Sequence, residues 1–175
     1  MEIGLVQIYT GDGKGKTTAA FGLALRACGR NLKVIIVQFL KNEDTGEIYS
    51  LKEIKNVEIY RFNSQKKFVW NMNESEIELL KKETLDGLQF VKDIIINNKC
   101  DVLILDEVVH CINKDYIKFN EMEYLIKNKP KSMELVLTGR DAKKELIEIA
   151  DLVTEMKCVK HPYEKGINAR IGIEK

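Results

Sequence analysis

The chain has 175 residues, of which 45% are hydrophobic and 31% charged, and its formal net charge is +1. This length and composition predict one globular domain with a full-sized core, spanning residues 1–175. The balanced charge gives no reason to expect nucleic acid or an anionic membrane as a partner. No apolar run reaches the roughly 18 residues of a membrane span, and the chain enters its first strand without a signal peptide, so we expect a cytoplasmic protein.

Strand-length apolar runs alternate with helix-length segments along the chain. Several runs are continuous stretches of Val, Ile and Leu, which is typical of strands buried on both faces of a parallel sheet. The pattern predicts an α/β domain with a mostly parallel sheet flanked by helices. We expect strands at residues 3–9, 33–39, 57–61, 102–105, 134–137 and 152–156, and helices at residues 16–30, 74–97 and 142–149.

Three segments show no clear strand or helix pattern. Residues 41–47 and 62–73 both follow predicted strand ends, where α/β sheets place their ligands. The tail beyond Lys157 contains a His-Pro pair and two glycines, and we expect it to be irregular or extended.

The segment between the first predicted strand and helix reads Thr10-Gly-Asp-Gly-Lys-Gly-Lys-Thr17. Strand, glycine-rich turn and helix form the context of a phosphate-binding loop (P-loop), because backbone N–H groups and a helix N-terminus then face an anion. In such loops the lysine, here Lys16, reaches the phosphates, and the hydroxyl of Thr17 ligates Mg²⁺. The alternative is a glycine-rich turn with two solvated lysines.

Two carboxylates, Asp106 and Glu107, follow the apolar run Val102-Leu-Ile-Leu105. A carboxylate at the end of a buried strand is costly unless a cation meets it. Mg²⁺ held jointly with Thr17 would be that cation. Which carboxylate ligates the metal stays open, and Glu107 has the alternative of the first turn of a following helix, where it suits the helix dipole.

The four cysteines show no C-x-x-C spacing, so we expect reduced thiols that pack as small residues. A zinc site is the alternative, because Cys158 with His161 forms C-x-x-H and His110 precedes Cys111.

Over nearly its whole length the sequence resembles the P-loop type of ATP:corrinoid adenosyltransferases. The loop of this family reads T-G-x-G-K-G-K-T-T, so Thr10, which departs from the first glycine of the common pattern, becomes a family signature. Other matching segments are Val37-Gln-Phe-Leu-Lys41, Leu103-Ile-Leu-Asp-Glu107, Leu137-Thr-Gly-Arg140, Glu148-Ile-Ala-Asp-Leu-Val-Thr-Glu155, and Val159-Lys-His161 with Gly172-Ile173.

The resemblance implies a P-loop NTPase-like, RecA-like fold and transfer of the 5′-deoxyadenosyl group of ATP to the Co(I) of a reduced corrinoid, with release of triphosphate, in cobalamin biosynthesis or salvage. Co(I) is a strong nucleophile without a proton to lose, so neither a protein nucleophile nor a general base is required. The protein must position the reactants and stabilise a highly charged leaving group. The resemblance also implies Mg²⁺ or Mn²⁺, ATP bound in the reverse sense, a homodimer and a flavodoxin-like reductase.

From motif and resemblance together we expect Lys14, Lys16 and Glu107 to be catalytic, and Thr17, Asp106 and Glu107 to hold the metal. Gln38 and Lys41 end the second predicted strand at the same edge and are lesser candidates. The residues expected to bind nucleotide or corrinoid are Thr10, Gly11, Asp12, Gly13, Lys14, Gly15, Lys16, Thr17, Thr18, Arg26, Phe68, Trp70 and Arg140.

Four of these binding residues have alternatives. Phe68 and Trp70 match a family aromatic pair that lies beneath the corrin and excludes the lower axial ligand, but such aromatics also anchor a core under a long loop. Arg26 has the alternative of a solvated helix arginine, and Arg140 that of an ion pair with Asp141 or Glu145. The chain departs from the family in lacking an N-terminal extension, so a segment that helps to close the site is either missing or supplied by a partner subunit. It also lacks the family's aromatic in residues 41–47, which leaves the choice of corrinoid open.

Two other functions stay open on the sequence. A P-loop kinase for a small molecule or nucleoside would use the same Mg²⁺ site, but its lid is usually rich in arginine, whereas the four arginines before the tail are scattered. A carrier that binds ATP and corrinoid without turnover is the other alternative.

Overall fold

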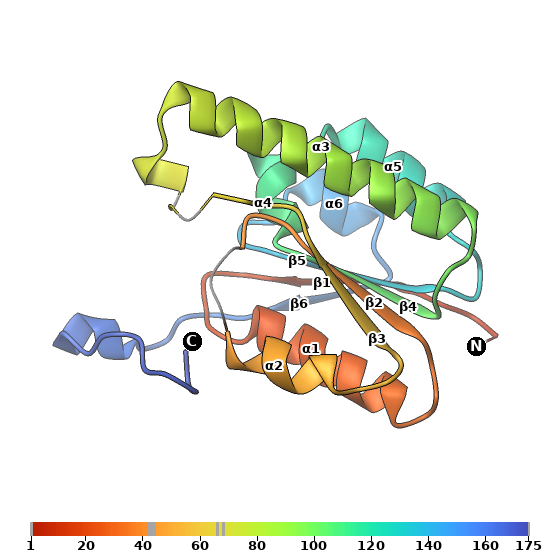
Figure 1. Cartoon of the computed structure of the whole chain (residues 1–175), viewed down its shortest axis with the longest axis horizontal. Helices are drawn as coiled ribbons and strands as arrows, with labels where there is room; N and C mark the ends of the chain where they lie inside the picture. Colours follow the sequence, from red (N-terminus) through yellow and green to blue (C-terminus); the bar gives the residue numbers. More distant parts are fainter. Residues whose placement is uncertain (1, 42–44, 66, 68, 175) are drawn as a thin grey trace.

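Six parallel strands form one sheet in the order β3-β2-β4-β5-β1-β6 (Figure 1). The computed structural model describes residues 2–41, 45–65, 67 and 69–174. The three central strands β2, β4 and β5 are buried along their whole length, as their continuous apolar sequences predict. The strands are β1 (Val6–Thr10), β2 (Val34–Gln38), β3 (Val57–Arg61), β4 (Val102–Asp106), β5 (Glu134–Thr138) and β6 (Leu152–Glu155).

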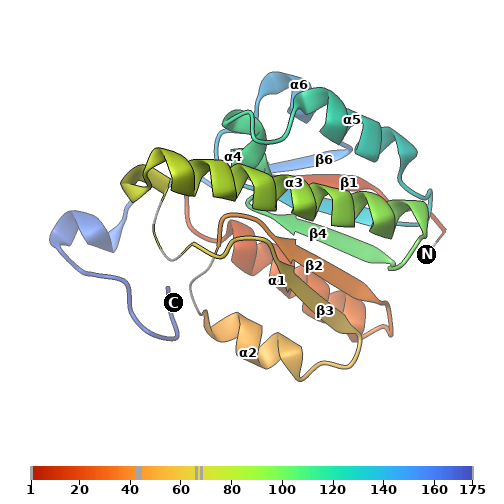
Figure 2. The same ribbon diagram turned by 45° about the horizontal axis from the view of Figure 1, so that its top comes forward.

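Helices cover both faces of the sheet and enclose a core on each side (Figure 1, Figure 2). Two helices, α1 (Lys16–Cys28) and α2 (Gly46–Lys52), lie on one face. The other face carries α3 (Glu74–Ile96), α4 (Val108–Asn113), α5 (Phe119–Asn128) and α6 (Lys144–Glu148). Short 3₁₀ turns are η1 (Val69–Asn71) and η2 (Pro162–Lys165).

The six predicted strands are all present, with shifted ends, but the helix prediction was incomplete. It missed α2, α4 and α5, of which α2 and α4 are too short to show a helical period. The predicted helix at 142–149 begins later, at Lys144, because Lys143 has an extended backbone with ψ 152°. The Ala142 N–H donates to the Thr10 hydroxyl (3.0 Å). The helix predicted at 74–97 is α3, and it begins with a capping box in which Asn73 and Glu76 each accept the other's backbone N–H (2.9 Å).

The strand order determines which residues meet at the carboxyl edge of the sheet. β4 lies between β2 and β5, and Gln38 is in register with Asp106. β5 in turn lies beside β1, with Thr138 opposite Tyr9 just before the glycine-rich loop. The loop and the ends of β2, β4 and β5 therefore converge, although they lie far apart in sequence.

The segment after β6 packs directly against the glycine-rich loop. The Gly13 N–H donates to the Met156 carbonyl at 2.7 Å. A Cβ atom on Gly11 would lie 2.3 Å from the same oxygen, and one on Gly13 would lie 2.7 Å from it. These two glycines are thus required by the close approach of the neighbouring backbone.

Beyond this contact the tail is exposed and irregular apart from η2, as predicted. It extends from the same end of the molecule as η1 (Figure 1, Figure 2). Its last described residue, Glu174, returns to form an ion pair with Lys14 at 3.2 Å. Among the described residues, no helix is long and apolar enough to cross a membrane.

We expect Gly11→Ala to destabilise the protein, because Gly11 has φ +99° and its new Cβ would overlap the Met156 backbone. Thermal unfolding should show a Tm lower by roughly 5–10 °C, from a loss of about 2–4 kcal/mol. The matched control is Gly22→Ala in α1, where a Cβ meets nothing within 4 Å. That control should raise the Tm slightly through its better helix propensity; equal effects of both substitutions would contradict the loop packing.

Candidate functional site

The ammonium of Lys16 lies inside the glycine-rich loop. Its Nζ donates to the carbonyl oxygens of Gly11 (2.8 Å) and Gly13 (2.7 Å), and the residue is only 9% exposed. Burial, together with the positive charge of Arg140, lowers the pKa of Lys16 below its usual value. The loop therefore concentrates positive charge at the N-terminus of α1, where a helix already favours anions.

The Asp106 carboxylate, at the end of β4, is fully buried and accepts four hydrogen bonds. Its Oδ1 accepts from the hydroxyls of Thr17 (2.9 Å) and Thr138 (2.7 Å). Its Oδ2 accepts from Gln38 Nε2 (2.9 Å) and from Lys41 Nζ (2.7 Å). Thr17 and Asp106, which the sequence assigned jointly to a metal, are therefore in direct contact.

Electrostatics keep Asp106 ionised despite its burial. Loss of hydration acts to raise its pKa, but the Lys41 ammonium and the hydrogen bonds from Lys41, Thr138 and Gln38 outweigh it. The pKa of Asp106 consequently lies below its ordinary value. Asp106 is thus negatively charged, and the sequence predicted that a cation would be needed beside this carboxylate.

Glu107 is held in a rare backbone conformation. Its φ is +64°, and its N–H donates to the Thr138 hydroxyl at 3.0 Å. Glu107 is the N-cap residue of α4. It therefore lies one position before the first helical turn, where the alternative interpretation had located it. Burial and the adjacent Asp106 carboxylate raise the pKa of its side chain.

The donor set around Thr17 and Asp106 fits Mg²⁺. Both provide hard oxygen atoms, and the Lys41 ammonium beside them shows that this point attracts a cation. Within the described ranges, no group of three or more His, Cys, Asp or Glu could enclose a metal. Mg²⁺ commonly takes one or two protein ligands together with substrate phosphates.

Several predicted nucleotide-binding side chains contact the protein itself. The Asp12 carboxylate accepts the Cys158 N–H (3.0 Å), and Lys14 Nζ donates to the Ile173 carbonyl (2.9 Å) as well as to Glu174. The Lys14 ammonium therefore points toward the tail and not toward Lys16. Thr18 is exposed on the first turn of α1.

The two predicted arginines lie in different places. Arg140 follows β5, is exposed, and lies close enough to the loop for its charge to lower the pKa of both Asp12 and Lys16. Arg26 lies in the last turn of α1, ten residues beyond Lys16, which is about 15 Å along the helix. Arg26 is exposed there, and its charge reaches Tyr9, the residue directly before the loop, where it acts to lower the pKa of the phenol.

The structure describes the predicted aromatic pair only in part. Phe68 lies outside the described residues, and for Trp70 only the backbone, in η1, is described. η1 precedes α3 at the end of the molecule from which the tail also extends (Figure 1).

The sequence joined Thr17 to Asp106 but did not identify the other three hydrogen-bond partners of this carboxylate. Gln38, Lys41 and Thr138 were only lesser candidates at the ligand edge of the sheet. Arg61, at the end of β3, was also missed; its Nε donates to the Gln38 amide oxygen (2.9 Å) and so orients that amide toward Asp106. Lys41 could have been identified from the sequence, because a buried carboxylate needs a cation and Lys41 is the lysine that follows the end of β2.

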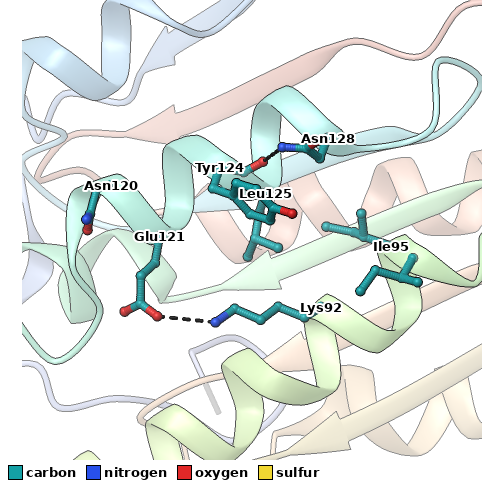
Figure 3. Close-up of a pocket in the computed structure, with 8 residues that line it drawn as sticks. Lys92, Ile95, Asn120, Glu121, Tyr124, Leu125 and Asn128 are labelled. Atoms are coloured by element: carbon teal, nitrogen blue, oxygen red, sulfur yellow. Dashed lines mark hydrogen bonds and ion pairs between the residues drawn. The ribbon is translucent and has the colours of Figure 1, made fainter.

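A hollow of about 510 Å³ between α3 and α5 lies apart from this site (Figure 3). Glu121 and Lys92 form an ion pair across it at 3.2 Å. Its residues come from the helix segments that lead to the amino ends of β4 and β5, so it faces the opposite end of the sheet from the loop. The lining residues are Lys92, Ile95, Ile96, Asn120, Glu121, Tyr124, Leu125 and Asn128.

Comparison with known proteins identifies the family of this chain. The family model described as ATP:corrinoid adenosyltransferase BtuR/CobO/CobP matches residues 2–174. The chain belongs to this family. Corrinoid adenosyltransferases of Escherichia coli strain K12 and of a Sinorhizobium species are 33% and 35% identical to it, over 99% of this chain and 86% and 81% of theirs.

A solved structure supports the fold assignment of this adenosyltransferase. The KaiC-like protein PH0186 of Pyrococcus horikoshii superposes with a TM-score of 0.53 at 15% identity, covering 87% of this chain and 73% of the other. At that identity the likeness concerns the fold alone, and it confirms the predicted P-loop NTPase-like architecture.

In this adenosyltransferase, Glu107→Gln should raise the Tm by a few degrees at pH 7, with EDTA present, and change it little near pH 4. The reason is that the pKa of Glu107 is raised on folding. Its contribution to stability is therefore complete below the unfolded pKa of about 4.3 and is lost as pH rises through the folded pKa. Thermal unfolding at both pH values checks this, with exposed Glu53→Gln as control; a Tm gain independent of pH would contradict it.

Proposed function

We propose that the chain transfers the 5′-deoxyadenosyl group of ATP to the cobalt of a reduced corrinoid and releases triphosphate. The observation that carries this proposal is the contact between Thr17 and Asp106 (2.9 Å), which joins the two nucleotide-site motifs beside the buried Lys16. Membership of the ATP:corrinoid adenosyltransferase family supplies the reaction.

In this reaction Co(I) attacks the 5′ carbon of ATP, a Co–C bond forms, and the bond from that carbon to the triphosphate oxygen breaks with its electron pair. Negative charge therefore accumulates on the triphosphate. Lys16 and the N-terminus of α1 are placed to stabilise that charge. The chain needs no proton acceptor, because none of these steps releases a proton.

We propose that Thr17 and Asp106 hold Mg²⁺, with Glu107 close by. Bound there, Mg²⁺ would neutralise part of the charge on the leaving triphosphate. We propose that Arg140, whose charge acts on Asp12 and Lys16, contacts either triphosphate or a carboxamide or carboxylate of the corrinoid. Lys14 would contribute only after leaving its ion pair with Glu174.

The corrinoid is proposed to lie against the segment that contains Phe68 and Trp70, as the family resemblance implies. The reaction consumes Co(I), so an electron donor of the flavodoxin-like reductase class is part of the proposal. We also propose a cytoplasmic homodimer. The four free thiols fit a reducing compartment, and the exposed apolar residues of edge strand β6 offer a surface for a second subunit.

Incubation with MgATP and a chemically reduced corrinoid should give the adenosylated absorption spectrum and free triphosphate in equal amounts. Lys16→Ala should lower that rate at least about 100-fold, because it removes the charge inside the loop. Lys131→Ala, on the exposed turn before β5, is the matched control and should keep wild-type activity. Formation of ADP would instead indicate a kinase, and corrinoid binding without product would indicate a carrier.

Trp70→Ala should lower the rate far more when the assay starts from Co(II) and a reductant than when it starts from pre-reduced Co(I). The proposed role of this ring is to exclude the lower axial ligand, which makes cobalt easier to reduce. Trp70→Phe should retain most of the Co(II) rate because it keeps an aromatic ring. Equal losses from both starting states would show that Trp70 has a structural role only.

A further inference from the structure

The Lys41 ammonium lies between the two oxygen atoms expected to hold the metal. Its Nζ is 2.6 Å from Thr17 Oγ1 and 2.7 Å from Asp106 Oδ2. Thr17 donates its own hydroxyl proton to Asp106 Oδ1, so the lone pair that faces Lys41 is the one a metal would use. Lys41 and a metal ion therefore compete for the same atoms.

The charge balance around Asp106 explains why a cation is needed there at all times. Gln38, Thr138 and Thr17 supply hydrogen bonds but no charge. Among the described donors to this carboxylate, Lys41 alone is charged. A fully buried carboxylate without a cation costs several kcal/mol, so Lys41 can leave only when another cation replaces it.

The backbone that carries Lys41 is fixed in an unusual turn. Leu40 has φ +58°, a left-handed conformation that is unfavourable for a branched side chain, and the Lys41 N–H donates to the Phe39 carbonyl at 2.7 Å. This turn directs the lysine back toward the end of β4. The side chain of Lys41 is 27% exposed, whereas that of Asp106 is 0% exposed, so the lysine has a route to solvent that the carboxylate lacks.

We propose that Lys41 is a place-holding cation, which neutralises Asp106 and orders Thr17 until the divalent metal of the incoming nucleotide takes its position. The proposal rests on the proposed Mg²⁺ site. The exchange is balanced in charge, because the metal replaces the ammonium at Asp106 while the triphosphate brings new anionic partners for the displaced lysine. It couples metal binding to nucleotide binding, since metal alone must compete with Lys41 without that compensation.

The test is Mn²⁺ binding in the absence of nucleotide, followed by electron paramagnetic resonance, for wild type and Lys41→Met. We expect Lys41→Met to bind Mn²⁺ about tenfold or more tightly than wild type, because the competing cation is gone. Lys41→Arg keeps the charge and should stay close to wild type. The double variant Lys41→Met with Asp106→Asn should lose the gain. Equal Mn²⁺ affinity of wild type and Lys41→Met would overturn the proposal.

Thermal unfolding provides a second readout. In EDTA, Lys41→Met should unfold several degrees below wild type, and Mn²⁺ should restore its Tm while leaving the wild-type Tm nearly unchanged. The exposed Lys131→Met is the matched control and should show neither effect. A Lys41→Met protein as stable as wild type in EDTA would contradict the neutralising role.

Should Lys41→Met fail to fold, the wild-type protein still decides the question through ¹H–¹⁵N spectra of its lysine ammonium groups. A protected Lys41 signal, assigned by its loss in Lys41→Arg, should shift with MgATP and stay unchanged with ATP in EDTA. No response to MgATP would overturn the exchange. These readouts need no corrinoid, so they are independent of the adenosylation assay. If Lys41 does not exchange but the protein adenosylates corrinoid, the proposed function stands. If Lys41 exchanges but no adenosylated product forms, only the proposed function is refuted.

Discussion

The organisation of the site depends on one buried charge, the carboxylate of Asp106. Ionised carboxylates are stable in a protein interior only when several donors surround them. Here the donors come from four places in the chain: α1, the end of β2, Lys41 in the turn after β2, and the end of β5. A single ion thereby ties the helix of the phosphate loop to the central strands of the sheet.

The fold was largely predictable because its signals are local. Continuous Val, Ile and Leu runs mark the central strands, and a glycine-rich turn between strand and helix marks the loop. The short helices were not predictable in the same way. α4, for example, has six residues and is buried on four of them, so packing against the sheet stabilises it more than any helical period in its sequence.

The site was only partly predictable, because its contacts depend on strand order. β3 separates β2 from β4 in the sequence, yet β2 and β5 flank β4 in the sheet and bring Gln38 and Thr138 to Asp106. The direction of a long side chain is equally hidden. Lys14 and Lys16 are two residues apart in one loop, but one points to the tail and the other into the loop.

The family resemblance covers both a whole loop and isolated residues, and these differ in what the structure can say of them. In the segment Thr10–Thr17 the sequence motif reflects constraints on the backbone, because Gly11 and Gly13 lie too close to Met156 to carry a side chain. Arg26 is a single position about 15 Å along α1 from Lys16, and its contact with nucleotide stays a prediction.

The contact between Met156 and the loop has a consequence for local dynamics. The segment that includes Met156 continues β6, which is an edge strand exposed along its whole length. Edge strands with little burial open locally at a small free-energy cost, well below that of global unfolding. Fraying of β6 would therefore release one wall of the phosphate loop while the core stays folded, so hydrogen exchange at Gly13 should follow that of β6 and not that of β4.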